Sequence, residues 1–335
     1  MKIRLYGTTM TVIASRCFQL LIVCFFGIGA VFDSYSQSNY PSKPIRIFVG
    51  SVPGASSDTY ARIVGDALSK NLNQSIQIEN RSGASGIIAT TAMLALPADG
   101  YQIQLIYTPH TLSPYLFKKL SYDSIKDVTG IGRIVTAPLV LAVSAKSNLK
   151  SFQDLIDLGK SKSLNYGSAG IGSGGHLSAE MLKIYAGLDV VHAPYRGASP
   201  AATAVAAGDV DFAFIAQITA RELMLANKIR ILAVTSKTRS PLLPNIPTMQ
   251  ELGLKDFEFN NWFGLIASAK IPSEVVNKLS NSLKEVLKDP EIRKKLTSDG
   301  SEIVADSPEQ FTKFLADDSK KWGPLIQQIG LKGED

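Results

Sequence analysis

The chain has 335 residues, of which 45% are hydrophobic and 19% are charged, an ordinary balance for a folded globular protein. This length predicts two domains, each large enough to bury its own core. The formal net charge is +6, but the basic residues are scattered, and the densest cluster, at 293–295, falls in a predicted amphipathic helix. We interpret that cluster as a solvated helix face and expect no nucleic-acid partner, because no nucleic-acid motif accompanies it.

The first 36 residues have the pattern of a secretory signal peptide. A positively charged leader precedes a nearly unbroken apolar run at 18–32, which is shorter than the roughly 20 residues that a membrane span needs. Small residues at 34–36 resemble an A-x-A cleavage site. We therefore expect export to the periplasm, with cleavage near Ser36 and Gln37; an uncleaved N-terminal anchor is the alternative.

Both cysteines, Cys17 and Cys24, lie in the predicted leader, so the mature chain has no thiol. This excludes disulfides, cysteine nucleophiles and thiolate metal sites, and it suits an oxidising compartment. The three histidines are far apart in the sequence, and nothing in their spacing indicates a metal site. We predict neither a metal nor a cofactor.

Short apolar runs alternate with helical patterns along the mature chain. Strands are predicted at 45–49, 75–79, 102–107, 139–144, 164–166, 190–193, 211–215, 229–235 and 263–267. Helices are predicted at 60–72, 86–96, 175–186, 198–207, 218–226, 275–287 and 308–329. The alternation predicts an α/β protein with βαβ units, mostly parallel sheets and helices on both faces. Because no linker separates the two domains, we expect strands near 139–144 and 260–266 to cross between them and form a hinge.

Three loops rich in glycine and serine follow predicted strands and precede predicted helices: the first loop (residues 50–58), the second loop (80–86) and the third loop (167–175). Such loops lie at the carboxyl edge of a parallel sheet, where ligands bind, and helix N-termini attract anions. Arg81 is their only arginine, so we predict a site that holds a carboxylate through hydroxyls and backbone amides, among them those of Gly54, Ala84 and Gly172. The candidate ligand contacts are Pro53, Gly54, Ala55, Ser56, Ser57, Ala84, Ser85, Thr108, His110, Ser168, Gly172, Ser173 and His176.

Simpler structural roles compete with this interpretation. Ser57 and Asp58 are good helix N-caps, Arg81 can be a turn residue, and a loop of glycine and serine can be only a tight turn. The third loop also contains G-x-G-x-x-G, the spacing of a dinucleotide-binding turn. The acidic residue that should end the next strand is missing there, because Asp189 precedes that strand. We therefore expect no dinucleotide.

The sequence contains no G-x-S-x-G elbow, no Walker loop and no H-E-x-x-H motif, so we predict that the protein is not an enzyme. An exported hydrolase remains an alternative, and it would need a nucleophile and a base that meet around Ser168 or Ser173. His192 lies in an apolar strand and is expected to be structural. His110 follows a predicted strand at the binding edge and His176 follows the third loop, so both are candidate ligand contacts.

The chain resembles the substrate-binding proteins of tripartite tricarboxylate transporters, also called Bug proteins. Its opening Y-P-S-K-P-I-R, at 40–46, is similar to the Y-P-x-K-P-I-R start of that family. Further stretches that resemble the family lie in order at 53–58, 79–84, 97–101, 166–170, 192–197, 232–236 and 262–264. Eight such stretches in register are highly specific, and together they extend from Tyr40 to about Leu331.

The resemblance implies a periplasmic-binding-protein fold of type II-like architecture, in which two doubly wound α/β domains are joined by two crossing strands. It implies domain 1 at 40–140 plus 262–331, domain 2 at 141–261, and a carboxylate in the cleft between them. The implied partners are a large and a small integral-membrane subunit, although many members are orphans; we expect a monomer. A sensory module that feeds a receptor would have the same fold.

Three departures from the family fall in the predicted site. Ala55 replaces the second glycine of the usual P-G-G, Ser82 and Ser85 replace proline and glycine of the usual N-R-P-G-A-G-G, and the stretch at 107–110 is bulky where the family is often small and polar. We therefore expect the fold to be shared, and we transfer no ligand of another member to this chain.

Overall fold

The structure is a computed structural model that describes residues 40–331. The predicted signal peptide lies outside the described residues. A new structural unit begins at Lys43, and the description below concerns residues 43–331 of it. Within this range, no helix combines the length and the apolar character that a membrane span requires.

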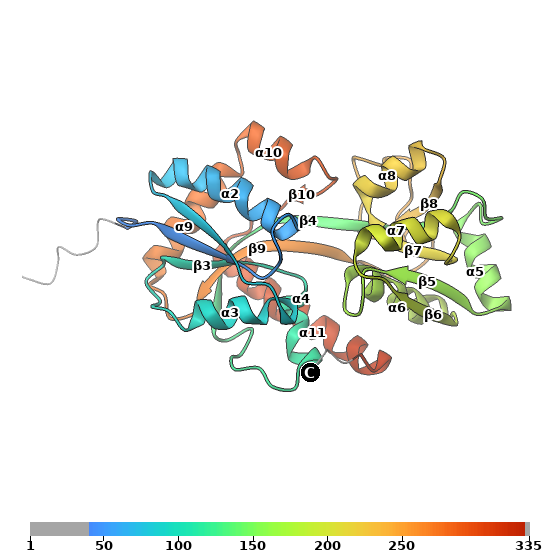
Figure 1. Ribbon diagram of the computed structural model, residues 1–335, viewed down its shortest axis with the longest axis horizontal. Helices are drawn as coiled ribbons and strands as arrows, with labels where there is room; N and C mark the ends of the chain where they lie inside the picture. Colours follow the sequence, from blue (N-terminus) through green and yellow to red (C-terminus); the bar gives the residue numbers. More distant parts are fainter. Residues whose placement is uncertain (1–39, 332–335) are drawn as a thin grey trace, which may run out of the picture. The chain divides into compact units, whose positions relative to one another are not determined.

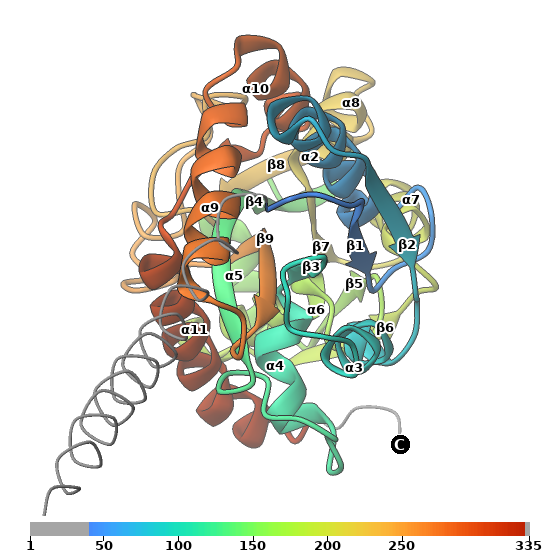
Figure 2. The same cartoon turned by 90° about the vertical axis from the view of Figure 1, so that its left-hand side faces the viewer.

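The first part of the chain forms three parallel strands in the order β2-β1-β3: β1 (Ile45–Val49), β2 (Ile76–Asn80) and β3 (Gln102–Tyr107). Strand β1 lies in the middle and is apolar along nearly its whole length, as expected of a parallel strand that is covered on both faces. Helix α2 (Ser56–Leu72) covers one face, and α3 (Ile87–Leu94) covers the other (Figures 1 and 2).

Strand β4 (Val128–Ser144) is 17 residues long and changes partners along its length. From Val128 to Pro138 it pairs antiparallel with β9 (Asn260–Ser268), which also pairs with β3. From Leu139 onward it pairs with β7 (Phe212–Ala216) and β8 (Ile229–Val234). Figure 1 shows β4 and β9 running side by side between the two groups of strands.

We use two names for these groups. The N-terminal strand group contains β1, β2, β3, β9, the short β10 (Glu302–Ile303) and residues 128–138 of β4; the central strand group contains β5–β8 and residues 139–144 of β4. Strands β5 (Leu164–Ser168), β6 (Val190–Pro194) and β7 are parallel, with β5 between the other two. Helices α6 (Gly174–Ala186) and α7 (Ala198–Ala207) lie on opposite faces of β5 and β7 (Figure 1).

The remaining helices complete both groups. They are α4 (Pro109–Leu116), α5 (Phe152–Ser161), α8 (Gln217–Leu225), α9 (Ser273–Val286), α10 (Pro290–Thr297) and α11 (Pro308–Ile329). Leu116 of α4 and Trp322 of α11 belong to the same buried apolar cluster as Phe212 and Phe259. Because α4 and α11 also pack on each other, this cluster continues from the central strand group onto both helices.

The predicted α/β class and the two crossing strands are confirmed, but several elements were not predicted, among them α5. The first part of β4, before residue 139, was not predicted, because its T-G-I-G-R stretch has low strand propensity and becomes a strand by pairing with β9. Helix α4 was also not predicted. Its Pro109 occupies the first turn, where a missing N–H costs nothing, and Pro114 lies inside it.

Candidate functional site

The first and second loops are in direct contact, because β1 and β2 are parallel neighbours and both loops leave the same edge. The amide of Arg81 donates to the carbonyl of Val49 at 2.8 Å. A Cβ atom on Gly50 would lie 2.5 Å from the Cα of Gly86, so only glycine fits at position 50. The third loop follows β5 and therefore belongs to the central strand group.

Asp58 organises the first loop from the first turn of α2. Its carboxylate is buried and accepts hydrogen bonds from the amide of Gly54 at 2.9 Å, from Arg62 and from Asn80 Nδ2. Burial acts to raise the pKa of Asp58, but these bonds outweigh it and hold the pKa below its ordinary value. The amide of Gly54 is thus not the free donor that the sequence predicted, and Asp58 has a structural role.

The two serines at the start of α2 differ in exposure. The Ser57 hydroxyl is buried and lies 2.6 Å from Ser51 Oγ, whereas Ser56 is exposed. Ala55 occupies the N-cap position and offers no side-chain acceptor to the first-turn amides of α2. This end of α2 can therefore receive an anion from solvent. Pro53 is exposed beside it.

The second loop contains four consecutive residues with positive φ: Gly83 at 129°, Ala84 at 44°, Ser85 at 55° and Gly86 at 95°. The left-handed region is unfavourable for alanine and serine, and strain of this kind persists where the surrounding structure or a function requires it. Ala84 and Ser85 are both exposed. The positive φ of Ser85 gives a physical reason for the glycine that the family usually has there.

The third loop is held by its own side chains. Ser173 is the N-cap of α6 and accepts from the amide of His176 at 3.3 Å, and the amide of Gly172 donates to His176 Nδ1 at 3.0 Å. The Gly172 amide is therefore not the free donor that the sequence predicted. Ser168 is buried, and its Oγ lies 2.7 Å from His192 Nε2 and 3.1 Å from the carbonyl oxygen of Gly170.

Two of the three histidines meet behind this loop. The rings of His176 and His192 are stacked, with centroids 4.1 Å apart, and the Tyr166 ring contacts both, at 4.8 Å from His192 and 6.2 Å from His176. Tyr166 donates its hydroxyl hydrogen to Glu180 Oε1 at 2.7 Å. Spacing along the sequence did not reveal this cluster. The signal that could have found it is the parallel register of β5 and β6, which places His192 beside Tyr166.

Thr108 and His110 lie at the start of α4, and both side chains are buried. Thr108 Oγ1 accepts from the amide of Trp262 at 3.3 Å, and His110 Nε2 donates to the carbonyl of Ser124 at 2.8 Å. Burial lowers the pKa of His110 to about 4. A small cavity of about 10 Å³, with room for roughly one water molecule, separates His110 from Ser85.

The loop after β6 was missed as part of the candidate site. The amide of Tyr195 donates to the carbonyl of Ser168 at 2.9 Å, so this loop lies against the third loop. Gly197, with φ of 119°, precedes α7 and provides no side-chain cap. Arg196 is exposed between them. The Y-R-G-A stretch has the same position, after a strand and before a helix, that identified the other three loops.

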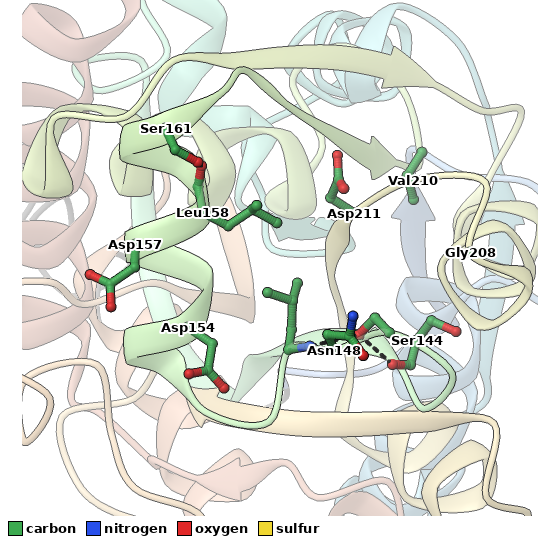
Figure 3. A pocket seen from close by; sticks show the side chains of 11 residues that line it. Ser144, Asn148, Asp154, Asp157, Leu158, Ser161, Gly208, Val210 and Asp211 are labelled. Atoms are coloured by element: carbon green, nitrogen blue, oxygen red, sulfur yellow. Dashed lines mark hydrogen bonds between the residues drawn. The ribbon is translucent and has the colours of Figure 1, made fainter.

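The depression in Figure 3 lies elsewhere. Its volume is about 580 Å³, and it is lined by residues around α5 and by Asp211. Asp211 precedes β7, and its amide donates a hydrogen bond to the carbonyl of Asn165 near the start of β5. This is the opposite edge of the parallel strands from the glycine loops. Two carboxylates there already accept hydrogen bonds from the backbone. Asp154 does so in the capping box of α5, and Asp211 accepts a hydrogen bond from the amide of Asn165. Within residues 40–331, no cluster of three or more histidine, cysteine or acidic side chains is arranged to hold a metal.

The fold is shared with solved periplasmic binding proteins. The structure of BugD superposes with a TM-score of 0.73 at 29% identity, covering 88% of this chain and all of that chain. The R. palustris protein Rpa4515, solved with adipate, superposes with a TM-score of 0.76 at 30% identity and the same coverage. MatC from Rhodopseudomonas palustris, solved with malate, gives a TM-score of 0.71 at 27% identity, covering 86% of this chain. The fold and its loops at the strand ends define a periplasmic solute-binding protein.

The family follows from the sequence comparisons. Residues 60–331 match the model of the tripartite tricarboxylate transporter family receptors. A protein of Agrobacterium vitis, from the ttuE-ttuC' intergenic region, is 34% identical over 81% of this chain and 79% of its own length. BugT of Bordetella pertussis is 28% identical over 93% of this chain and 97% of its own length. The chain belongs to the tripartite tricarboxylate transporter receptor family, as the sequence predicted.

Proposed function

We propose that this protein captures a small carboxylate-containing metabolite in the periplasm and delivers it to the large and small membrane subunits of a tripartite transporter. The observation that carries the proposal is the uncapped N-terminus of α2 beside the strained second loop, where Ser56, Ala84 and Ser85 are exposed. First-turn amides and a nearby hydroxyl suit a carboxylate. Adipate and malate, which accompany the two relatives from R. palustris, are the first ligands to test.

The proposed site lies between the two strand groups. Ser56, Ala84 and Ser85 contribute from the N-terminal strand group, and the backbone of the third loop contributes from the central strand group. The change of partners of β4 after Pro138, together with the start of β9 at Asn260, supports two domains at 40–140 plus 262–331 and at 141–261. Two crossing strands without a linker then form the hinge.

A thermal-shift titration tests this function directly. The exported form is mixed in turn with adipate, malate, citrate and benzoate, and the melting temperature is measured as a function of ligand concentration. A ligand that binds only the native state stabilises it by about 2.7 kcal/mol at a hundredfold excess over Kd, so a carboxylate ligand raises the melting temperature. If no mono-, di- or tricarboxylate does so, while an uncharged solute does, the proposed ligand class is wrong.

Export and assembly are part of the proposal. The mature protein begins near Gln37, acts as a monomer and uses no cofactor. N-terminal sequencing of the periplasmic fraction checks the cleavage site, and recovery of Met1 there would contradict it. Co-purification with membrane subunits separates a transport receptor from a sensory module of the same fold.

Hydrolysis is a second candidate function, because the Ser168 and His192 side chains have the distance of a nucleophile and its base. Against it, only 1% of the Ser168 surface is exposed, and its hydroxyl also bonds the backbone of Gly170. We therefore propose that the protein catalyses no reaction. Turnover of p-nitrophenyl acetate that disappears in Ser168→Ala would favour a hydrolase instead.

A further inference from the structure

The side chain of His176 determines the shape of the third loop. The amide of Gly172 donates to its Nδ1, so this ring nitrogen carries no proton and the ring is neutral. Gly172 itself has φ of 75°, a left-handed conformation that glycine adopts readily and that most other residues avoid. Because Ser173 also caps the backbone of His176, the loop between 172 and 176 closes on itself through two side-chain bonds.

The second ring of the pair belongs to the same arrangement. His192 stacks on His176 with an angle of 11° between the rings, and its Nε2 lies 2.7 Å from Ser168 Oγ. The other titratable groups of this cluster are Tyr166 and Glu180, which are hydrogen-bonded to each other. Glu180 favours a positive charge on His192, whereas His192 disfavours a charge on His176.

We propose that His176 is a positioning residue that fixes the third loop for ligand binding, and that protonation of the stacked His176 and His192 pair releases this loop. A protonated Nδ1 is a donor and cannot accept from Gly172, and two charged rings in contact repel each other. The inference concerns regulation of the proposed binding site and therefore rests on the proposed function.

The pH range of this switch is acidic. Burial, with the neighbouring His192 as a second cause, lowers the pKa of His176 to about 4. At neutral pH the ring is neutral and the loop is fixed. When the loop opens, His176 regains an ordinary pKa near 6.5, so the open form gains protons first as the pH falls.

The test uses the ligand-free protein and measures amide hydrogen exchange of Gly172 by NMR. The protection factor, which is corrected for the intrinsic exchange rate, is expected to fall by roughly tenfold per pH unit between pH 6 and pH 4. His176→Asn is the matched variant, because Asn Oδ1 can replace Nδ1 as the acceptor but does not titrate. Its Gly172 protection should not vary over this range. His176→Phe, which keeps a ring but has no acceptor, should lose protection at every pH.

Two results would overturn the inference: wild-type protection of Gly172 that does not change with pH, or a His176→Asn variant with the same pH dependence as the wild type. If His176→Phe does not fold, the comparison of the wild type with His176→Asn still tests whether protonation of His176 releases the third loop. The exchange experiment needs no ligand, so it can succeed even if the thermal-shift screen finds no carboxylate. With adipate as the probe, a Kd that rises below pH 5 in the wild type alone would extend the result to binding.

Discussion

The indole Nε1 of Trp262 donates a hydrogen bond of 3.1 Å to Asp318 Oδ2 and so connects the crossing strand β9 to helix α11. The same carboxylate accepts from Thr111 Oγ1 at 2.6 Å and from Trp322 Nε1 at 3.0 Å. Asp318 therefore joins α4, β9 and α11 at the place where the chain passes between the two strand groups.

The first prediction follows from this carboxylate. Asp318→Ala leaves the indole N–H groups of Trp262 and Trp322 without their acceptor, whereas the Thr111 hydroxyl can still donate to the carbonyl of Thr108. Each buried unsatisfied group costs about 1–3 kcal/mol, so the free energy of unfolding should fall by about 2 kcal/mol or more. Urea denaturation measures this change. The matched control is Asp317→Ala, because Asp317 is exposed and pairs only with Lys313 on the helix surface. Equal losses in the two variants would show that the buried connection contributes no special stability.

The second prediction concerns the two serines at the start of α2. Ser56→Ala should weaken binding of the ligand found by thermal shift by roughly tenfold, because a hydrogen bond to a charged group contributes about 1.5–3 kcal/mol. Ser57→Ala should leave affinity nearly unchanged and lower stability, since its buried hydroxyl bonds Ser51. Calorimetry and thermal melts on both variants separate the effects. An affinity loss in Ser57→Ala but not in Ser56→Ala would contradict the prediction and would place the ligand deeper than the first loop.

The third prediction concerns the third loop. Gly172→Val forces a β-branched residue into φ of 75°, which distorts the loop even though its Cβ would lie at an ordinary 3.7 Å from Leu116. Ligand affinity should fall more than in Ser168→Ala. Gly172→Asn is the control, because asparagine tolerates this conformation. Normal binding by Gly172→Val would mean that the third loop is only a structural turn.

The fourth prediction concerns acid stability. Burial lowers the pKa of His110 to about 4, whereas the ordinary value is 6.5. Between these values the unfolded chain binds one more proton at this residue than the folded chain does. The stabilising contribution is therefore complete above pH 6.5 and is lost as the pH falls towards 4, with a slope of about 1.4 kcal/mol per pH unit.

His110→Gln isolates that contribution, because its amide can still donate to Ser124 but does not titrate. Chemical denaturation at pH 4.5, 5.5 and 6.5 should give a shallower pH dependence in the variant than in the wild type. Other titrating groups cancel in this difference. Parallel curves for the two proteins would show that His110 titrates normally in the folded state.

The fifth prediction concerns closure. Rotation about β4 near Pro138 and β9 near Asn260 should bring the two strand groups together around the ligand. Solution scattering with a saturating ligand should show a smaller radius of gyration than without it. An unchanged radius, in a protein whose ligand-free state is shown to be open, would exclude a closing hinge.

The sequence by itself determined the fold class and the position of the glycine-rich loops at the strand ends. Apolar runs such as residues 45–49 are long enough for strands, and the following helical periodicity specifies βαβ units. Glycine and serine at the strand ends then mark the carboxyl edge. These features are local, since they depend on the period of the side chains and on the backbone freedom of glycine. For this reason they can be identified without knowing which segments meet.

Only the tertiary structure decided which groups in those loops are available. The amides of Gly54 and Gly172 have the expected positions, but Asp58 and His176 already accept their hydrogen bonds. A side chain can satisfy a nearby amide only in one loop conformation, and the sequence does not specify that conformation. The stacking of His176 on His192 likewise depends on the pairing of β5 with β6, which brings together residues from separate strands and helices. Such long-range pairing is set by the packing of the whole sheet, and no local pattern encodes it.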